Sequence, residues 1–227
     1  MKRAMQRAWG YVLQIFFAPL CIACGKYLER SGNNDVLICN TCFDSIPIYR
    51  TVFYGPTFAL VAVTSYDNEA VMKLLHFFKY RRFVNSVYTL DRLIKTYLAG
   101  LDFKKLIPEN AVIIPVPLYK KRLRERGFNQ AEEIAKILGK YLNLPVEGTL
   151  LLKIKDTPHQ TTLKNKAERK ESVKNSFAVY EKSNVVDKGV ILVDDVYTSG
   201  ATMNEAVKML RRTGAKNIVG FVIAKTA

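Results

Sequence analysis

The sequence lacks long apolar runs, and this absence excludes one class of protein. No stretch of about 18 apolar residues occurs, so we expect no helix that spans a membrane. The first residues are basic and then apolar, but Gln14 interrupts the apolar region and no small-x-small cleavage site follows. We therefore expect a cytoplasmic protein whose N-terminal segment forms an amphipathic helix on the body. A peripheral helix at the inner face of the membrane is the alternative.

Two kinds of catalytic motif are also missing. No G-x-x-x-x-G-K-[ST] loop is present, because both Gly-Lys pairs are followed by Tyr, so a P-loop nucleotide hydrolase is excluded. Histidine is scarce, with 2 in the chain. His76 lies in an apolar helical pattern and His159 in a polar segment, and neither position indicates a catalytic base.

Acidic residues are few relative to basic ones. The chain has 20 Asp and Glu against 35 Lys and Arg, which gives a formal net charge of +15. This balance favours polyanionic partners, namely nucleic acid, phosphorylated ligands or an anionic membrane surface, without choosing among them. Hydrophobic residues make up 49% of the 227 residues, enough for one sizeable core with a small additional module.

Cysteine is confined to one short region and forms two C-x2-C pairs there. The four residues are Cys21, Cys24, Cys39 and Cys42. Two residues between cysteines let both sulfurs turn toward one ion, and Gly25 suits the tight turn that follows the first pair. Two such pairs complete the four-sulfur shell of a structural zinc site. Two disulfides are the alternative, but they need an oxidising compartment.

We assign residues 1–47 to this cysteine module and residues 48–227 to the main domain. The residues between the two pairs are expected to form a short hairpin. A module this small buries too little apolar surface to fold alone, so the metal must supply much of its stability. Two roles remain open for it: a docking or nucleic-acid-binding ribbon, and a structural cap on the main domain.

The main domain alternates between apolar strands and amphipathic helices. Strands are expected at 58–66, 111–117, 146–154, 176–180, 190–193 and 217–223, and helices at 68–80, 84–98, 129–142 and 202–212. Asn68 and Asn129 are placed to cap two helices, and Gly214 to end a third. Continuously apolar strands are typical of a parallel sheet with helices on both faces, so we predict an α/β fold.

The segment VILVDDVYTSGAT joins an apolar strand to two adjacent carboxylates and then to hydroxyl groups. Asp194 and Asp195 fall at the carboxyl end of a strand, where such sheets bind ligands. We expect the chain to turn there, so that both acids face one ligand, and a divalent metal or vicinal hydroxyls to offset their repulsion. The residues that follow lead into a helix N-terminus, which favours a phosphate. The hydroxyl and glycine positions are Thr198, Ser199, Gly200 and Thr202.

Three other interpretations of this segment account for less of it. A Walker-B strand would need the missing P-loop, and a response-regulator acidic pair would leave the hydroxyl groups without a role. A strand end followed by a capped helix would leave the paired acids unexplained. The pattern therefore favours a site for a ribose 5-phosphate.

The segment resembles the phosphoribosyl pyrophosphate (PRPP) binding motif of type I phosphoribosyltransferases. The resemblance implies that Asp194 and Asp195 hold the ribose hydroxyls, help to order Mg²⁺ and take part in catalysis. It also implies that the loop after them surrounds the 5-phosphate. The PRPP-binding residues would then be Asp194, Asp195, Tyr197, Thr198, Ser199, Gly200, Ala201 and Thr202.

Further segments resemble the ComF family of competence-associated proteins. In order along the chain they are CIACGK, CNTC, LLHFFKYRRF, PVPLYKKRLRERGFNQAEEIA, TPHQTTLKNKAERKESVKNSF and the PRPP motif. This resemblance implies a type I phosphoribosyltransferase fold with an N-terminal zinc ribbon, and a role in natural transformation. Single-stranded DNA would be a partner, and a competence helicase or other DNA-uptake proteins are candidate partners.

Two basic segments complete the expected site. Within the family resemblance, Arg122 and Arg126 take the position of the pyrophosphate loop, and guanidinium groups suit that dense anion. The alternative is the solvated start of a basic helix. The polar segment 153–170 resembles the hood loop that closes over PRPP, with Lys155, Gln160 and Arg169 as its candidate contacts, and a disordered linker is the alternative.

The residues leave three functions open. The first is a phosphoribosyltransferase with an unidentified acceptor, in which Mg²⁺ and basic side chains stabilise the leaving pyrophosphate. The second is a non-catalytic adaptor that binds single-stranded DNA and uses PRPP only as a ligand. The third is a nucleobase-salvage transferase, which the missing acceptor signature argues against. Lys79 and Arg81, at the end of an apolar helix, are further candidate ligand contacts.

Overall fold

The computed structural model describes residues 20–28, 36–80, 83–100, 103–157, 166–180 and 185–226. The expected N-terminal helix, the turn of the cysteine hairpin, Arg81, His159 and Gln160 lie outside these residues. All four cysteines and the segment from 190 to 202 lie within them. Within the described part of the chain, no helix combines the length and apolar character needed to cross a membrane.

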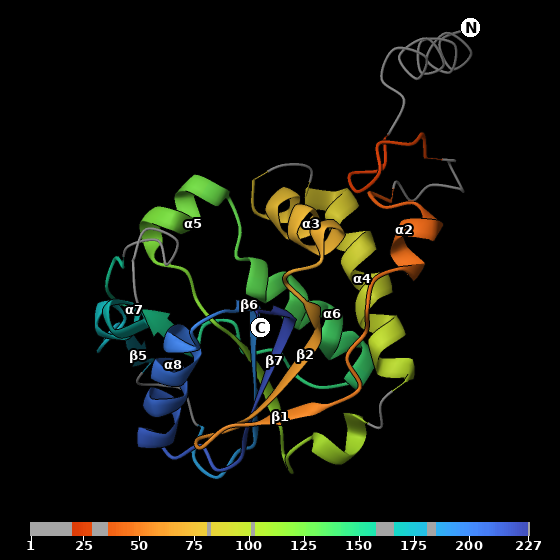
Figure 1. The fold of residues 1–227 in the computed structure, drawn as a ribbon. Coiled ribbons are helices and arrows are strands. Elements are labelled where there is room, and N and C mark those ends of the chain that lie inside the picture. The colour runs from red at the N-terminus through yellow and green to blue at the C-terminus, as the bar shows by residue number, and fades with distance from the viewer. Residues whose placement is uncertain are drawn as a thin grey trace, which may run out of the picture.

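The centre of the molecule is a five-stranded sheet, which Figure 1 shows at the middle of the fold. In spatial order its strands are β1 (Val52–Tyr54), β2 (Ala59–Ser65), β7 (Ile218–Lys225), β6 (Val190–Tyr197) and β3 (Val112–Pro115). The last four strands in this order run parallel, and β1 pairs with β2 in the antiparallel direction. The predicted parallel sheet is therefore confirmed, with an antiparallel edge strand that the sequence did not indicate.

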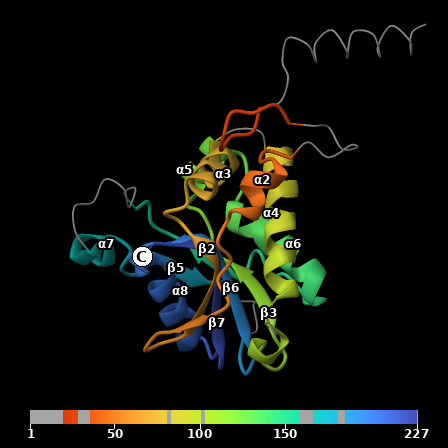
Figure 2. The same ribbon diagram turned by 45° about the vertical axis from the view of Figure 1, so that its right-hand side comes forward.

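Helices cover both faces of this sheet (Figures 1 and 2). Three of them, α3, α4 and α6, pack on one face, and α8 packs on the other. Their bounds are α3 (Glu69–Tyr80), α4 (Phe83–Ala99), α6 (Gln130–Leu142) and α8 (Ala201–Arg212). A short 3-10 helix, η1 (Phe103–Leu106), follows α4.

Strand β6 shows why the strands are apolar without alternation. Ile191 and Val193 pack into the cluster formed with α3, α4 and α6, whereas Val190 and Leu192 pack into the cluster formed with α8. All four side chains are fully buried. Because both faces of the strand are covered, successive residues must all be apolar, which is the pattern that the sequence presented.

The predicted helix signals are found where the sequence placed them. The Asn68 side chain accepts a hydrogen bond from the N–H of Val71 at 3.2 Å, and the Asn129 side chain accepts one from Ala131 at 3.2 Å. Both bonds satisfy N–H groups that the first turn of a helix leaves unpaired. Gly214 follows α8 with a φ of +97°, the left-handed conformation that ends many helices.

Four short elements differ from the expectations. The strands β4 (Leu151–Lys153) and β5 (Phe177–Val179) form a separate antiparallel pair and not part of the parallel sheet. The expected pyrophosphate loop contains the helix α5 (Lys120–Arg126), and the expected hood loop contains α7 (Lys166–Ser172). Both helical segments are rich in Lys, Arg and Glu, which favour helix where no core packing decides the conformation.

The cysteine module packs on α4 and adds to the main core. Ile38 and Phe43, the latter in α2 (Asn40–Asp44), belong to the same apolar cluster as α3, α4 and α6. The Arg92 guanidinium lies 3.7 Å from the centre of the Phe43 ring and donates to Asn40 at 2.8 Å. The N–H of Leu37 donates to a threonine hydroxyl of α4. These contacts are those expected of a structural cap on the main domain.

Candidate functional site

The two adjacent carboxylates lie on β6 itself and not in a turn after it. Parallel pairing with β7 places Asp194 opposite Val222 and continues to Tyr197, opposite Lys225. The expectation that the chain turns at Asp194 is therefore wrong, because hydrogen bonding to β7 keeps it extended. On the other side, β3 pairs with β6 only as far as Val193. No described strand pairs with the rest of β6 on that side, and this edge is where a ligand can approach.

A cavity of about 240 Å³ lies at this open edge, and both carboxylates line it. Asp194 and Asp195 therefore face one site, as the sequence predicted, although they lie on an extended strand. Four cationic side chains also line the cavity: Lys79, Arg122, Arg126 and Lys153. The end of β6, the loop after it and the start of α8 contribute Tyr197, Thr198, Gly200, Ala201 and Thr202. The site thus combines two acids, four cations and a hydroxyl-rich loop.

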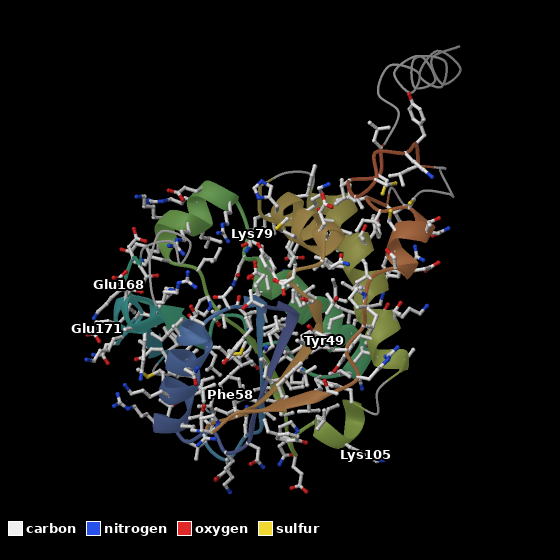
Figure 3. All side chains as sticks on the ribbon, in the orientation of Figure 1. Tyr49, Phe58, Lys79, Lys105, Glu168 and Glu171 are labelled. Carbon is white, nitrogen blue, oxygen red and sulfur yellow. The ribbon has the colours of Figure 1, made fainter. Side chains whose placement is uncertain are left out.

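Lys79 supplies much of the positive charge that the two acids need. Its Nζ lies 2.7 Å from Asp195 Oδ2, with only 22% and 14% of the two side chains exposed. Figure 3 labels Lys79 at the end of α3, above the end of β6. The sequence offered Lys79 only as one of several candidate cations. The structure makes it the direct ion-pair partner of Asp195.

The electrostatic environment shifts the pKa values of the two carboxylates in opposite directions. Burial and the neighbouring charge of Asp195 raise the pKa of Asp194 to about 7. Burial acts in the same direction on Asp195, but the charge and hydrogen bond of Lys79, together with the charge of Arg126 and the N–H of Val196, outweigh it and lower the pKa of Asp195 below its ordinary value. Asp195 is therefore ionised and paired, whereas Asp194 gains or loses a proton near neutral pH.

Lys153 also has an unusual environment in the cavity. Burial, followed by the nearby charge of Arg122, lowers the pKa of Lys153 to about 8. Its Nζ lies 5.1 Å from the centre of the Phe177 ring, so β5 helps to hold it in place. A buried lysine beside an arginine is energetically costly, and an anionic ligand in the cavity would offset that cost.

The helix α5 presents Arg122 and Arg126 to the cavity. The two residues are four apart, so they lie on the same side of the helix. The Arg122 guanidinium donates to the carbonyl oxygen of Thr157, which joins α5 to the start of the hood segment. The Arg126 guanidinium donates to Gln130 Oε1 at 2.8 Å. The basic helix that the sequence offered as one alternative is present, and it brings both arginines to the cavity; their role as an anion site stays a prediction.

The motif RGFNQ holds this arginine relative to the sheet. Phe128 packs on Phe78 of α3, with ring centres 5.5 Å apart. Asn129 donates to the carbonyl oxygen of Val116, just beyond β3, at 3.1 Å while it also caps α6. Gln130, which is 2% exposed, then fixes Arg126. The motif therefore links α3, β3 and α6 around the cavity.

The loop between β6 and α8 brings a helix N-terminus and hydroxyl groups to the cavity. Gly200 is the N-cap of α8 with a φ of +75°, and a Cβ there would overlap the Tyr197 hydroxyl. The first residues of this 12-residue helix, Ala201, Thr202 and Met203, line the cavity, so the N-terminus of the helix lies at the same end of the sheet. Thr198 and Thr202 line the cavity, whereas Ser199 does not. Of the predicted loop residues, Ser199 alone faces elsewhere.

The expected hood contacts are not assembled here. Lys155 is exposed, and its Nζ lies 3.4 Å from the carbonyl oxygen of Lys174. Arg169 lies on α7, and neither residue lines the cavity. Their role over a bound ligand stays a prediction. Lys153, two residues before Lys155, lines the cavity, alone among the described residues of this segment.

The four cysteine sulfurs fit a single tetrahedral ion. All four lie within 4.8 Å of one another, and Cys24 Sγ is 3.8 Å from Cys39 Sγ. A tetrahedron with zinc–sulfur bonds of about 2.3 Å has edges of about 3.8 Å, so the sulfurs are already spaced for zinc. Hydrogen bonds with the sulfurs of Cys24 and Cys39 raise the pKa of Cys42 to about 12. A divalent cation would relieve this crowding of thiolates.

Comparisons with known proteins agree with this geometry. A model of the phosphoribosyl transferase domain matches residues 123–226, which include α6, β6 and α8. Competence protein F of Haemophilus influenzae is 31% identical over 221 residues, which cover 95% of this chain and 89% of that protein. This chain belongs to the ComF family.

Other relatives of this ComF-family protein carry related names. Competence protein ComFC of Streptococcus pneumoniae is 31% identical over 91% of this chain and 87% of its own length. The DNA utilization protein YhgH of Escherichia coli K12 is 28% identical over 91% of this chain and 84% of its own length. The matches span the cysteine module as well as the sheet, so the predicted family, fold class and competence-related character are confirmed.

Proposed function

We propose that this ComF-family protein binds PRPP together with Mg²⁺ in the cavity at the end of β6, and that it does so while handling DNA during natural competence. One observation supports the ligand above all others. Two carboxylates on β6 share a cavity with four cations and with the loop at the start of α8. PRPP carries three matching groups on one small molecule, namely vicinal hydroxyls, a diphosphate and a 5-phosphate.

Each part of the cavity has a partner on that ligand. Asp194 and Asp195 accept hydrogen bonds from the two ribose hydroxyls. The N–H groups at the start of α8, with the hydroxyls of Thr198 and Thr202, bind the 5-phosphate. Arg122, Arg126, Lys79 and Lys153 surround the diphosphate, where guanidinium groups bind two oxygens at once.

The donor set also fits the accompanying metal ion. The buried carboxylate of Asp194 has a raised pKa, so a divalent cation nearby would favour its ionised form. Bound Mg²⁺ would neutralise charge on the diphosphate as the bond to the anomeric carbon breaks. Lys79 holds Asp195 in place at 2.7 Å, so that the acid is oriented before the ligand arrives.

The proposed role in competence includes the binding of single-stranded DNA. Relatives named for competence and DNA utilization support it, as does the net charge of +15. The acceptor of the ribose 5-phosphate is not specified by any group that lines the cavity among the described residues. A transferase with an unidentified acceptor and an adaptor that binds PRPP without turnover both use this same site. Release of pyrophosphate on addition of DNA or nucleobases separates them.

Calorimetric titration with PRPP, with and without Mg²⁺, tests the ligand directly. We expect Mg²⁺-dependent binding by the native protein and a loss of about ten- to a hundredfold in affinity for Asp194→Asn and for Asp195→Asn. Thr202→Val removes one hydroxyl and should lower PRPP affinity by a smaller factor. Asp187→Asn, the same change at an exposed residue that pairs with Lys216, is the matched control and should bind normally. Equal binding by all four variants and the native protein would refute the assignment of the acids.

A further inference from the structure

A second cavity, of about 470 Å³, lies on the α8 side of the sheet. It is formed by the hairpin between β1 and β2, by α8, by Lys170 of α7 and by the ends of β6 and β7. It shares Tyr197 and Ala201 with the first cavity, but neither of the two acids and none of the four cations there. The second cavity is therefore a separate site, divided from the first by the loop after β6.

The lining of this cavity combines aromatic rings with positive charge. Phe53, Tyr54, Phe58 and Tyr197 supply the rings, and Lys170 and Lys225 supply the charge. No acidic residue lines the cavity in the part of the chain that the structure describes. Rings that stack on flat groups, next to cations that attract phosphates, are what proteins present to single-stranded nucleic acid. The volume falls in the range of preformed ligand sites, about 300 to 1,000 Å³.

Tyr54 is the most exposed large hydrophobic residue of this lining. It is 80% exposed and lies on the edge strand β1, next to the turn that joins the hairpin. An aromatic side chain so exposed gains little from packing, and a stacking partner would cover it. Lys225, at the end of β7, also lines the cavity, and its Nζ lies 5.1 Å from the centre of the Phe53 ring.

The hairpin is fixed in place, so the cavity exists before any ligand arrives. The hydroxyl of Thr57 lies 3.1 Å from Asn204 Oδ1, and the Arg211 guanidinium donates to the Thr57 carbonyl oxygen. Both partners are on α8. Figure 3 labels Phe58 where the hairpin lies beside that helix. A preformed site loses less conformational entropy on binding.

The same asparagine connects this cavity to the phosphate loop. Asn204 Nδ2 donates to the carbonyl oxygen of Gly200 at 2.8 Å, while its Oδ1 meets Thr57 of the hairpin. Ser199, which does not line the first cavity, lines this one. One loop therefore forms a wall of both cavities.

From this geometry we infer that the second cavity binds a nucleobase of single-stranded DNA. The base stacks on Tyr54 at the hairpin rim, and the flanking phosphates contact Lys170 and Lys225. The identity of the strand rests on the proposed function, because the cavity alone specifies only a base with adjoining phosphate. Duplex DNA keeps its bases stacked inside the helix, so it cannot fill this site.

Fluorescence anisotropy with a labelled short oligothymidylate tests this inference on the intact protein. We expect Tyr54→Ala to weaken binding about fivefold or more, as loss of one stacked base does, and Tyr54→Phe to bind normally because the ring remains. Tyr88→Ala, which removes an exposed tyrosine from α4 on the other face of the sheet, is the matched control. An oligonucleotide that contains iodinated uracil should form a photo-crosslink to the peptide of the β1–β2 hairpin.

The charged half of the site is tested in the same assay. Lys225→Gln should weaken oligothymidylate binding and reduce its salt dependence, whereas Lys140→Gln, an equal loss of charge on α6, should have a smaller effect. Normal oligothymidylate binding by both Tyr54→Ala and Lys225→Gln would overturn the inference. So would saturation of the cavity by thymidine monophosphate without any binding of the oligomer.

Titration of Tyr54→Ala with PRPP separates this inference from the proposed function. The cavity that holds the acids does not include Tyr54, so PRPP binding should be unchanged in this variant. If the native protein binds PRPP and the hairpin substitution leaves DNA affinity unchanged, only the second site is refuted. A native protein that binds neither ligand refutes the proposed function as well.

Discussion

At the scale of single residues, Asp194 shows that the site is built at a cost to stability. Burial and the charge of Asp195 raise the pKa of Asp194 from 3.8 to about 7. The folded ligand-free protein therefore binds a proton that the unfolded chain has lost between these two values. The stabilising contribution of that proton is complete below about pH 4 and disappears as the pH rises through about 7.

Asp194→Asn should remove this pH dependence. Its amide oxygen can still accept from the N–H of Asp195, which lies 2.9 Å from Asp194 Oδ1 in the native protein. At pH 4 we expect the variant and the native protein to unfold at similar denaturant concentrations. At pH 8 the ligand-free variant should be more stable by on the order of 1–3 kcal/mol. Urea unfolding at both pH values measures this, and a variant that is less stable at pH 8 would contradict it.

Gln130 is a second residue whose effect on PRPP affinity can be measured separately from its effect on stability. Its Oε1 holds Arg126, but its buried Nε2 has no partner among the described residues. Gln130→Met should therefore leave thermal stability near the native value, because it removes an unsatisfied donor along with the useful acceptor. PRPP affinity should fall about fivefold, because Arg126 loses its orientation.

Gln130→Glu provides the matched comparison, since it keeps an acceptor for Arg126 and should restore most of the PRPP affinity. Calorimetry for affinity and thermal denaturation for stability distinguish the two effects. If both variants bind PRPP as the native protein does, Gln130 does not position Arg126. If Gln130→Met binds PRPP weakly only because it is unfolded at the assay temperature, the proposed positioning role is wrong.

Sequence pattern identified some site residues and missed others for a physical reason. The acids and the loop after them share one short segment, so their chemistry is visible without a fold. Lys153 lies in a three-residue strand that faces the cavity only because β4 pairs with β5, far along the chain. Gln130 was visible as part of RGFNQ, but its hydrogen bond to Arg126 depends on the angle between α5 and α6. Roles set by such long-range geometry leave no local signal.

At the scale of elements, long and continuously patterned segments were predictable and short ones were not. The bounds of three strands and four helices, namely β2, β6, β7, α3, α4, α6 and α8, lie within two residues of those expected, except that β6 extends four residues further, to Tyr197. β1 and the pairing of β4 with β5 were missed or misplaced. Strands of three residues are decided by their partners and not by their own periodicity.

The cysteine module and α4 are coupled, which makes zinc important beyond the module. Ile38 and Phe43 are buried in the cluster that contains α3 and α4. We expect one tightly bound zinc per chain, and we expect its removal by a strong chelator to lower the unfolding temperature of the main domain. Cys39→Ser should have the same effect, whereas Thr41→Ala, an exposed change in α2, should not.

Elemental analysis and hydrogen exchange check this prediction together. Exchange should accelerate in α2 and along the face of α4 that carries Arg92 when the metal is removed. A metal-free protein with two disulfides would show that the cysteine assignment is wrong. A zinc protein whose unfolding is unaffected by chelation would show that the contacts with α4 contribute little.

At the scale of the whole molecule, the excess of positive charge predicts how DNA binding responds to salt. With a net charge of +15, affinity for single strands should come largely from phosphate contacts that release counterions. Three or more such contacts would lower affinity about tenfold or more between about 50 and 200 mM salt. An oligomer with uncharged methylphosphonate linkages is the control, and its weaker binding should not change with salt. Affinity of the natural oligomer that stays constant over this range would contradict the prediction.

The two cavities share one loop, so the two proposed ligands can influence each other. We propose that PRPP binds at the open edge of β6 and that a DNA base binds on the opposite side of the same loop. Asn204 touches both the loop and the hairpin. Binding at one side can therefore alter the loop that the other side uses, which is a coupling that titration of each ligand in the presence of the other would measure.

A structure of the protein with PRPP and Mg²⁺ tests the central claim most directly. The account predicts ribose hydroxyls on Asp194 and Asp195, the 5-phosphate at the start of α8, and the diphosphate among Lys79, Arg122 and Arg126. Asp195→Asn, prepared in the same way, should show weak or absent ligand density. A ligand bound elsewhere on the native protein, or bound at β6 without contact to either carboxylate, would contradict the account.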